Sequence, residues 1–310
     1  MTASPSAAPR LLESPGCVWD ARAALGEGTW WSVREEALWW VDILGGELHR
    51  HAPATGQQRS WRFEGETISA VAERETGPGL VVTLRRSFAW FDPETGDLRR
   101  LPEVEPDRPK NRFNDGKCDA RGRFWAGTMD FDAKAPTGAL WRIEGGGAGG
   151  GPRIERVLDA RFAVTNGPAW SHDGRTMWFS DTVRGTVHAY PFDPDAGTLG
   201  EPRVFLQLGG KEGHPDGMTT DAAGRLWIAH WGASCVTCHD PASGAELLRV
   251  SLPATQVSNV AFGGAALDTL YVTTARQNLD AAALEAQPLA GGLFAVRTDA
   301  KGLAPDRFAG

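Results

Sequence analysis

Acid and amide side chains recur at regular intervals along this chain. Each lies 11 or 12 residues before a Trp or Tyr within an apolar segment. The recurring residues are Glu27, Asn114, Asn166, Asp216 and Asn259, and Ile68 takes the equivalent position in the one remaining unit. Carboxylate and carboxamide oxygens are ligands for hard or borderline divalent cations. If the fold brings these positions together, the sequence predicts an oxygen-rich site for one such cation.

A second interpretation of the same residues is local. Asn and Asp before Gly are common turn formers, so "NDG", "NG" and "PDG" could be turns and nothing more. The Glu27 of "LGEG" favours the cation site, because Glu has no special role in turns. Arg112, two residues before Asn114, adds a cation that could hold a substrate oxygen.

The elements that must position these residues repeat along the chain. Apolar segments begin at Trp39, Leu80, Trp125, Trp178, Trp227 and Tyr271. Their spacings are 41, 45, 53, 49 and 44 residues, which is the period of a propeller blade with four short strands. The sequence therefore predicts an all-β, six-bladed β-propeller with four antiparallel strands per blade. The polar residues are expected just ahead of the innermost strands, where they converge on the central channel at one face.

The two ends of the chain are expected to meet. The last unit, which ends in "GGLFAVRTDAKG", leaves little room for an outer strand, and the early segment "GCVWDA" is unassigned. We expect this N-terminal segment to complete the last blade and close the ring. Residues 1–12 are predicted to be a disordered tail and residues 13–310 a single propeller domain. Residues 279–291 are the only clear helical candidate.

Composition limits the partners and the compartment. The net charge of −7 disfavours nucleic acid and anionic membranes as partners. The sequence has no run of about 18 apolar residues and no apolar signal core at its start, so we expect a cytoplasmic protein without a membrane span. We also expect a monomer.

Four cysteines are too few and too scattered for a disulfide framework. Cys235 and Cys238, in "SCVTCH", would point to opposite faces of a strand and could not chelate one ion together. We interpret them as strand residues rather than as a zinc or redox site.

The standard signatures of several hydrolases are absent from the sequence. It contains no G-x-S-x-G, no H-E-x-x-H and no Walker A motif. His214 precedes "PDG" and is better interpreted as a turn or supporting residue than as the base of a nucleophile. These observations disfavour a serine hydrolase and favour a hydrolase that uses metal and water.

Five segments carry a family resemblance, in order, between about Cys17 and Val296. They are "LGEG", "NRFNDGKCDARGRFWAGTMD", "TNGPAWSHDGRTMWFSDT", "HPDGMTTDAAGRLWIAHWG" and "LYVTTAR". The chain resembles the SMP-30/gluconolactonase/regucalcin family, and most of all its bacterial xylono-, arabino- and gluconolactonases. The resemblance implies a six-bladed propeller that holds one divalent metal in its channel and hydrolyses sugar lactones to open-chain aldonates.

The resemblance also implies roles for individual residues. The family's metal ligands correspond to Glu27, Asn166 and Asp216. Its substrate contacts correspond to Arg112, Asn114 and Asp132, although the segment "DFDAKAPTG" around Asp132 departs from the family pattern.

A lactonase mechanism follows from these roles. Asp216 would be both a metal ligand and the general base that takes a proton from the attacking water. Calcium, zinc, manganese and iron(II) all remain open as the metal. Two rival functions also remain: a non-catalytic calcium-binding or scaffold propeller, and a phosphotriesterase or aryl-lactonase. The polar residues Arg112 and Asn114 favour a hydroxylated substrate over an apolar one.

Overall fold

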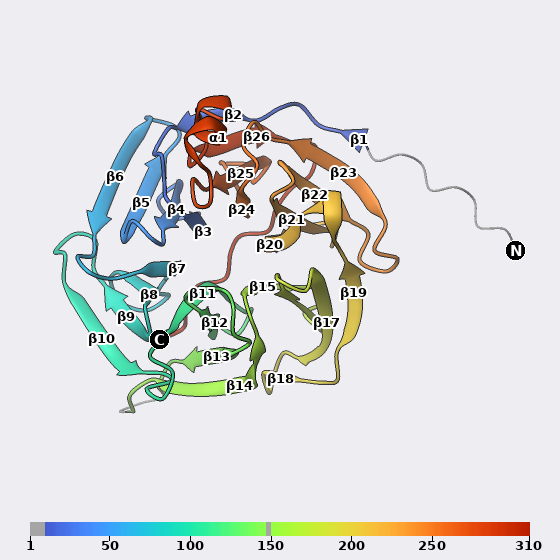
Figure 1. The fold of residues 1–310 in the computed structure, drawn as a ribbon. Helices are drawn as coiled ribbons and strands as arrows, with labels where there is room; N and C mark the ends of the chain where they lie inside the picture. The colour runs from blue at the N-terminus through green and yellow to red at the C-terminus, as the bar shows by residue number, and fades with distance from the viewer. Residues whose placement is uncertain (1–9, 147–149) are drawn as a thin grey trace, which may run out of the picture.

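The computed structural model describes residues 10–146 and 150–310, apart from the side chain of residue 160. These residues form six small sheets arranged in a ring around a central channel (Figure 1). Apart from the two N-terminal strands, neighbouring strands within each blade are antiparallel and follow one another along the chain, so each sheet runs outward from the centre of the ring. The predicted all-β, six-bladed propeller is confirmed.

The first three blades each contain four strands. Their bounds are β3 (Gly26–Ser32), β4 (Ala37–Asp42), β5 (Glu47–Ala52) and β6 (Gln57–Arg62); β7 (Ile68–Glu73), β8 (Leu80–Leu84), β9 (Ser87–Phe91) and β10 (Leu98–Glu103); β11 (Asn111–Cys118), β12 (Phe124–Asp130), β13 (Gly138–Glu144) and β14 (Arg153–Phe162).

The last three blades vary this plan. Their elements are β15 (Thr165–Trp170), β16 (Thr176–Asp181), β17 (Thr186–Asp193), β18 (Thr198–Leu199) and β19 (Arg203–Gln207); a 3₁₀ turn (Gly210–Glu212), β20 (His214–Thr220), β21 (Leu226–Trp231), β22 (Cys235–His239) and β23 (Glu246–Ser251); β24 (Val257–Gly263), β25 (Thr269–Thr274), α1 (Ala281–Ala286) and β26 (Leu293–Arg297). The helix α1 falls within the predicted helical segment.

The N-terminal segment closes the ring. Strand β2 (Gly16–Trp19) pairs antiparallel with β26 and is the outer strand of the sixth blade, as predicted for "GCVWDA". Strand β1 (Arg10–Leu11) pairs in parallel with β23 of the fifth blade. Of the predicted tail, residues 1–9 lie outside the described residues, while its next two residues form this β1 pairing.

A repeated side-chain network shapes two of the hairpins that lead away from the innermost strands. The Asp119 carboxylate accepts hydrogen bonds from Arg123 Nε at 2.6 Å and from Trp125 Nε1 at 2.7 Å. In the fifth blade, Asp221 accepts from Arg225 Nε at 2.7 Å and from Trp227 Nε1 at 2.9 Å. The recurring "D-x-x-G-R-x-W" phrase therefore fixes the hairpin and anchors a buried Trp.

Aromatic side chains fill the spaces between the blades. Trp31 of β3 stacks on Tyr271 of β25 with ring centroids 5.7 Å apart, which joins the first blade to the sixth. Trp39, Trp125 and Trp227, each in the second strand of its blade, are fully buried. Burial of each large aromatic side chain contributes about 1.5–3 kcal/mol, so the blades are held together chiefly by these apolar contacts.

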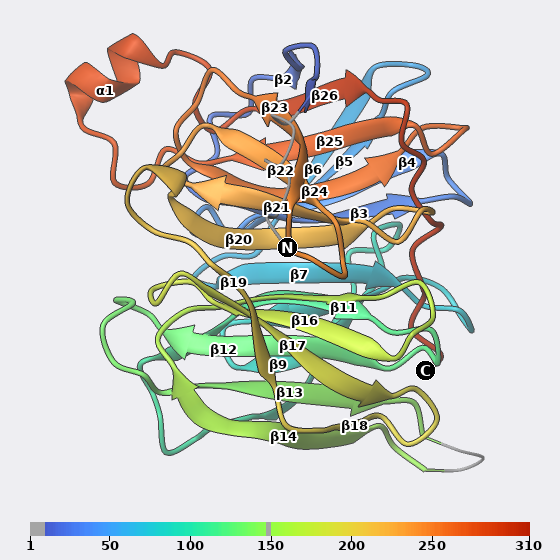
Figure 2. The same ribbon diagram turned by 90° about the vertical axis from the view of Figure 1, so that its right-hand side faces the viewer.

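The two faces of the propeller carry different coverings (Figure 2). The helix α1 projects from one face, and the C-terminal segment after β26 runs along the other. That segment contacts several blades, because Asp306 O accepts from Trp30 Nε1 at 3.4 Å and Phe308 N donates to Glu73 O at 2.8 Å. Among the described residues, no helix has the length and apolar character needed to cross a membrane.

Candidate active site

The innermost strands β3, β7, β11, β15, β20 and β24 all contain a register shift near their first residues. A bulge places two residues of one strand opposite one residue of its partner and redirects the side chains there. Glu27, Asn114, Asn166, Asp216 and Asn259 all lie at or beside these bulges. The prediction that they stand just ahead of the innermost strands is wrong by a few residues, because each strand begins before its polar residue.

A chain of hydrogen bonds joins the third blade to the fourth. Arg112 Nη1 donates to Asn114 Oδ1 at 2.7 Å, and Asn114 Nδ2 donates to Asn166 Oδ1 at 3.1 Å. Asn166 Nδ2 in turn donates to Thr182 Oγ1 at 2.8 Å. These bonds fix the orientation of both amides, with the Asn166 oxygen directed toward Asn114. Arg112, Asn114 and Asn166 are each at most 4% exposed.

The carboxylates of Glu27, Asp115 and Asp216 come from the first, third and fifth blades and are equally buried. Asn259 Nδ2 donates to Glu27 Oε2 at 2.8 Å, which ties the sixth blade to the first. Asp115 accepts the backbone N–H of Gly167 at 3.0 Å and its neighbour's N–H at 2.8 Å. Asp216 Oδ1 is buried and has no hydrogen-bond partner among the described residues.

This concentration of buried acids raises their pKa values. Burial, followed by repulsion from Asp115, raises the pKa of Glu27 to about 8. Burial and then the charge of Glu27 raise the pKa of Asp216 well above its usual range. Burial also lowers the pKa of Arg112 to about 10, while the charges of Glu27 and Asp216 act in the opposite direction. Like charges this close disfavour ionisation of all three acids, although Arg112 and Lys117 partly offset the repulsion.

The residues present fit a divalent cation. Glu27 and Asp216 supply carboxylate oxygens, Asn166 supplies an oriented amide oxygen, and Asp216 Oδ1 lacks any other partner among the described residues. Hard cations prefer such all-oxygen ligand sets. The described residues hold no cluster of three His, Cys, Asp or Glu side chains suited to a metal, so this set combines only two carboxylates with the amide.

The structure brings together five of the six predicted site residues, and Asp132 is the exception. It lies in the exposed turn after β12, and no hydrogen bond joins its carboxylate to the other five within the described residues. Two buried groups were not predicted for the site: Asp115 and Lys117. In a regular strand Asp115 would point away from Asn114, but the shift between Phe113 and Gly116 lets both face the channel.

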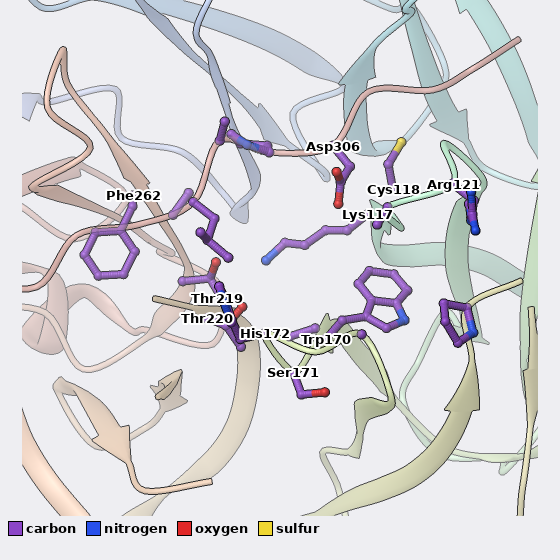
Figure 3. A pocket seen from close by; sticks show the side chains of 18 of the residues that line it. Lys117, Cys118, Arg121, Trp170, Ser171, His172, Thr219, Thr220, Phe262 and Asp306 are labelled. Carbon is purple, nitrogen blue, oxygen red and sulfur yellow. The ribbon is translucent and has the colours of Figure 1, made fainter. Parts of the chain in front are cut away.

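Lys117 lies between the acids and a cavity at the other end of the innermost strands. Its Nζ donates to the carbonyl oxygen of Met218, so the side chain reaches from the third blade to the fifth. Beyond it lies a cavity of about 630 Å³ that is lined by the later residues of the innermost strands and by the C-terminal segment (Figure 3). Thr219, Thr220 and Asp306 line this cavity, whereas none of the six predicted site residues does.

The cysteine pair lies where the sequence places it. Cys235 and Cys238 both belong to β22, and all four cysteines of the chain are free. Burial raises the pKa of Cys235 to about 11 and that of Cys238 to about 12. Both are therefore protonated thiols at neutral pH, which are poor metal ligands and poor nucleophiles.

Comparison with known proteins shows where else this arrangement occurs. Residues 25–276 match the model of the "SMP-30/Gluconolactonase/LRE-like region". A 6-deoxy-6-sulfogluconolactonase of Pseudomonas putida is 36% identical over 97% of this chain and 100% of that protein. An L-arabinolactonase of Azospirillum brasilense is 36% identical over 94% of each chain. The crystal structure of a calcium-binding protein, regucalcin, from Agrobacterium tumefaciens superposes with a TM-score of 0.89, at 28% identity, over 97% of this chain and 99% of that one.

Proposed function

The chain belongs to the SMP-30/gluconolactonase/LRE-like family, and from this premise we propose that it hydrolyses a sugar lactone to the open-chain aldonate with the help of one divalent cation. The observation that carries the proposal is the unpartnered, buried Oδ1 of Asp216 beside Glu27 and the oriented amide of Asn166. Relatives named as lactonases for more than one sugar acid support the reaction class.

Glu27, Asn166 and Asp216 would hold the cation. When bound, a divalent cation polarises an ester carbonyl and lowers the pKa of water. Asp216 is placed to accept the proton that the attacking water loses, because its Oδ1 has no competing donor among the described residues. A buried carboxylate in this position would accept and release one proton per turnover.

Arg112 and Asn114 would orient the lactone. Arg112 Nε is buried without a hydrogen-bond partner in the described part of the chain, so this N–H is available for a substrate oxygen. The other end of the guanidinium is held by Phe113 O at 2.9 Å and by the Asn114 amide. A fixed cationic donor near the reacting carbonyl stabilises negative charge that develops on its oxygen.

A non-catalytic calcium-binding propeller would use the same acids, and the similar protein from Agrobacterium tumefaciens is described as calcium-binding. Turnover separates the two functions. The protein would first be stripped with a chelator and then assayed at neutral pH on xylono-, arabino- and gluconolactone, with calcium, zinc, manganese or iron(II) added back singly. We expect hydrolysis that returns with at least one metal. Metal binding without hydrolysis of any lactone would favour the binding protein.

We further propose a monomer with a single domain over residues 13–310. A cytoplasmic location is also proposed, because free, buried cysteines such as these suit a reducing compartment.

A further inference from the structure

We propose that Arg85 and Phe131 form a subsite for an anionic substituent of the lactone, so that the preferred substrate carries an acidic group in addition to its lactone ring. This inference rests on the proposed lactonase function and names the substrate class within it. The groups with suitable chemistry are sulfonate, phosphate and carboxylate.

Phe131 lies between the buried Arg112 and the surface of the protein. It directly follows β12, and its backbone N–H donates to Lys110 O at 2.9 Å beside the start of β11. Its side chain is 40% exposed and is the only aromatic one among the exposed large apolar side chains of residues 10–146 and 150–310. Its ring is therefore partly accessible to a ligand.

The Phe131 ring lies between two arginines. The guanidinium carbon of Arg112 is 5.9 Å from the ring centroid, and that of Arg85 is 5.6 Å from it. Arg112 is buried and belongs to the reaction site, whereas Arg85 is exposed at the end of β8. A molecule held by Arg112 therefore has Phe131 and then Arg85 next to it on its outer side.

The Arg85 guanidinium is free to bind an anion. Its only hydrogen bond within the described part of the chain is from Nη2 to Pro109 O at 3.2 Å, and it forms no ion pair there. Contact with the Phe131 ring limits its conformations, and four of its five N–H groups have no partner in the described part of the chain. A planar guanidinium presents paired donors that match the oxygens of a carboxylate, phosphate or sulfonate.

Further cations surround this subsite. Lys110 and Lys134 are exposed on either side of Phe131 in the chain, and both lower the pKa of Asp130. Acids also lie close: Asp132 is exposed next to Phe131, and Glu66 Oε2 accepts from the backbone N–H of Arg85 at 3.4 Å. The Glu66 carboxylate pairs with Arg100 at 2.8 Å, and neither acid forms an ion pair with the Arg85 guanidinium within the described residues.

The test compares glucono-1,5-lactone with its 6-phosphate, using the metal-loaded protein. We expect a kcat/KM at least about tenfold higher for the phosphorylated lactone, which corresponds to about 1.4 kcal/mol, and an advantage that shrinks as salt is added. Arg85→Gln should reduce the ratio of the two kcat/KM values by about tenfold, and Phe131→Leu should reduce it by less. Equal kcat/KM values for the two lactones in the parent protein would overturn the proposal.

A matched control exists on the outer strand β19. Arg203 is exposed and lies 5.7 Å from the Phe205 ring, so Arg203→Gln removes the same kind of charge from the same kind of contact far from the channel. This variant should leave the ratio unchanged. If Arg203→Gln and Arg85→Gln lower it equally, the effect is general electrostatics and the subsite is wrong.

Measuring how tightly the reaction products bind tests the subsite independently of the lactonase function. Calorimetry with gluconate and 6-phosphogluconate needs no turnover. If 6-phosphogluconate binds more tightly than gluconate, and if Arg85→Gln removes that difference, the subsite is supported. This holds even if neither lactone is hydrolysed, because a lack of hydrolysis would contradict only the proposed reaction. Equal affinity for the two acids contradicts the subsite even in an active enzyme.

Discussion

Asn114 Nδ2 donates to Asn166 Oδ1 at 3.1 Å across the boundary between the third and fourth blades. The first of these residues is a proposed substrate contact and the second a proposed metal ligand, so the two roles are physically connected. Because the bond uses an N–H of Asn114, it leaves a lone pair of the Asn166 oxygen for the cation. A substitution at either residue is therefore expected to weaken both metal binding and substrate binding.

Asn114→Ala tests this connection. Loss of a buried hydrogen bond costs about 1–3 kcal/mol, so kcat/KM should fall by roughly one to two orders of magnitude. Metal should still bind, but more weakly than in the parent, because Asn166 loses the bond that orients its oxygen. Calorimetric titration with the metal and lactone kinetics measure the two effects. Unchanged metal affinity would mean that Asn166 is held by Thr182 alone.

Asp216→Asn tests the proposed base. The substitution keeps the shape of the side chain but removes its charge and its ability to accept a proton. We expect kcat to fall by about 10²–10⁴-fold, and the metal content per chain to fall as well. Asp221→Asn is the matched control in the same blade: it breaks the bonds to Arg225 and Trp227 and should lower the melting temperature while metal content is retained. Full lactonase activity in Asp216→Asn would refute the mechanism.

Stability at acidic pH is expected to depend on His230. Its Nδ1 lies 2.7 Å from Glu212 O and its Nε2 lies 2.6 Å from Thr237 Oγ1, and burial lowers its pKa to about 4. The folded state thus favours the neutral ring, compared with an unfolded pKa of 6.5. This contribution, up to about 3 kcal/mol, is present above pH 6.5 and is lost as the pH falls toward 4.

The corresponding measurement is the melting temperature between pH 7 and pH 4, with a chelator present so that metal binding does not contribute. His230→Gln should lose less stability over this range than the parent. His49, whose pKa burial also lowers to about 4, titrates in both proteins and cancels from the comparison. Parallel curves for the two proteins would show that His230 does not titrate on unfolding.

Truncation from the N-terminus tests ring closure. Deletion of residues 1–20 removes β2 and leaves an edge of β26 unpaired, so the melting temperature should fall by many degrees. Deletion of residues 1–12 removes β1, a two-residue strand at the outer edge of the fifth blade, and Leu12, which donates to Arg249 O at 2.9 Å, and should have a smaller effect. Equal melting temperatures for both truncated proteins and the parent would contradict a closing role for β2.

The propeller could be predicted because its signals are local and repeated. Apolar strands at regular spacing and turn residues between them recur in every blade. The segment that includes Gly16–Trp19 fits none of the six repeated units, and this indicates that it completes the last blade. The ring positions of Glu27, Asn166 and Asp216 followed from the same spacing.

Side-chain direction could not be predicted in the same way. Asp115 and Lys117 face the channel only because β11 contains a register shift, and no feature of the sequence predicts that shift. The subsite at Arg85 and Phe131 depends on the second blade touching the turn after β12, a contact between residues 46 positions apart. The role predicted for Asp132 remains a prediction, since the structure leaves its side chain in an exposed turn.

The pairing of β2 with β26 has a consequence for how the protein is made. Cys17 of β2 pairs with Phe294 of β26, so β2 cannot form this pairing until β26 has been synthesised. While the ribosome builds the intervening blades, the apolar edge of each new blade has a neighbour on one side only. Such contacts between distant parts of a chain form slowly, and exposed strand edges invite aggregation. The ring can therefore close only after β26 has been synthesised, and the folding of any one earlier blade is not sufficient for closure.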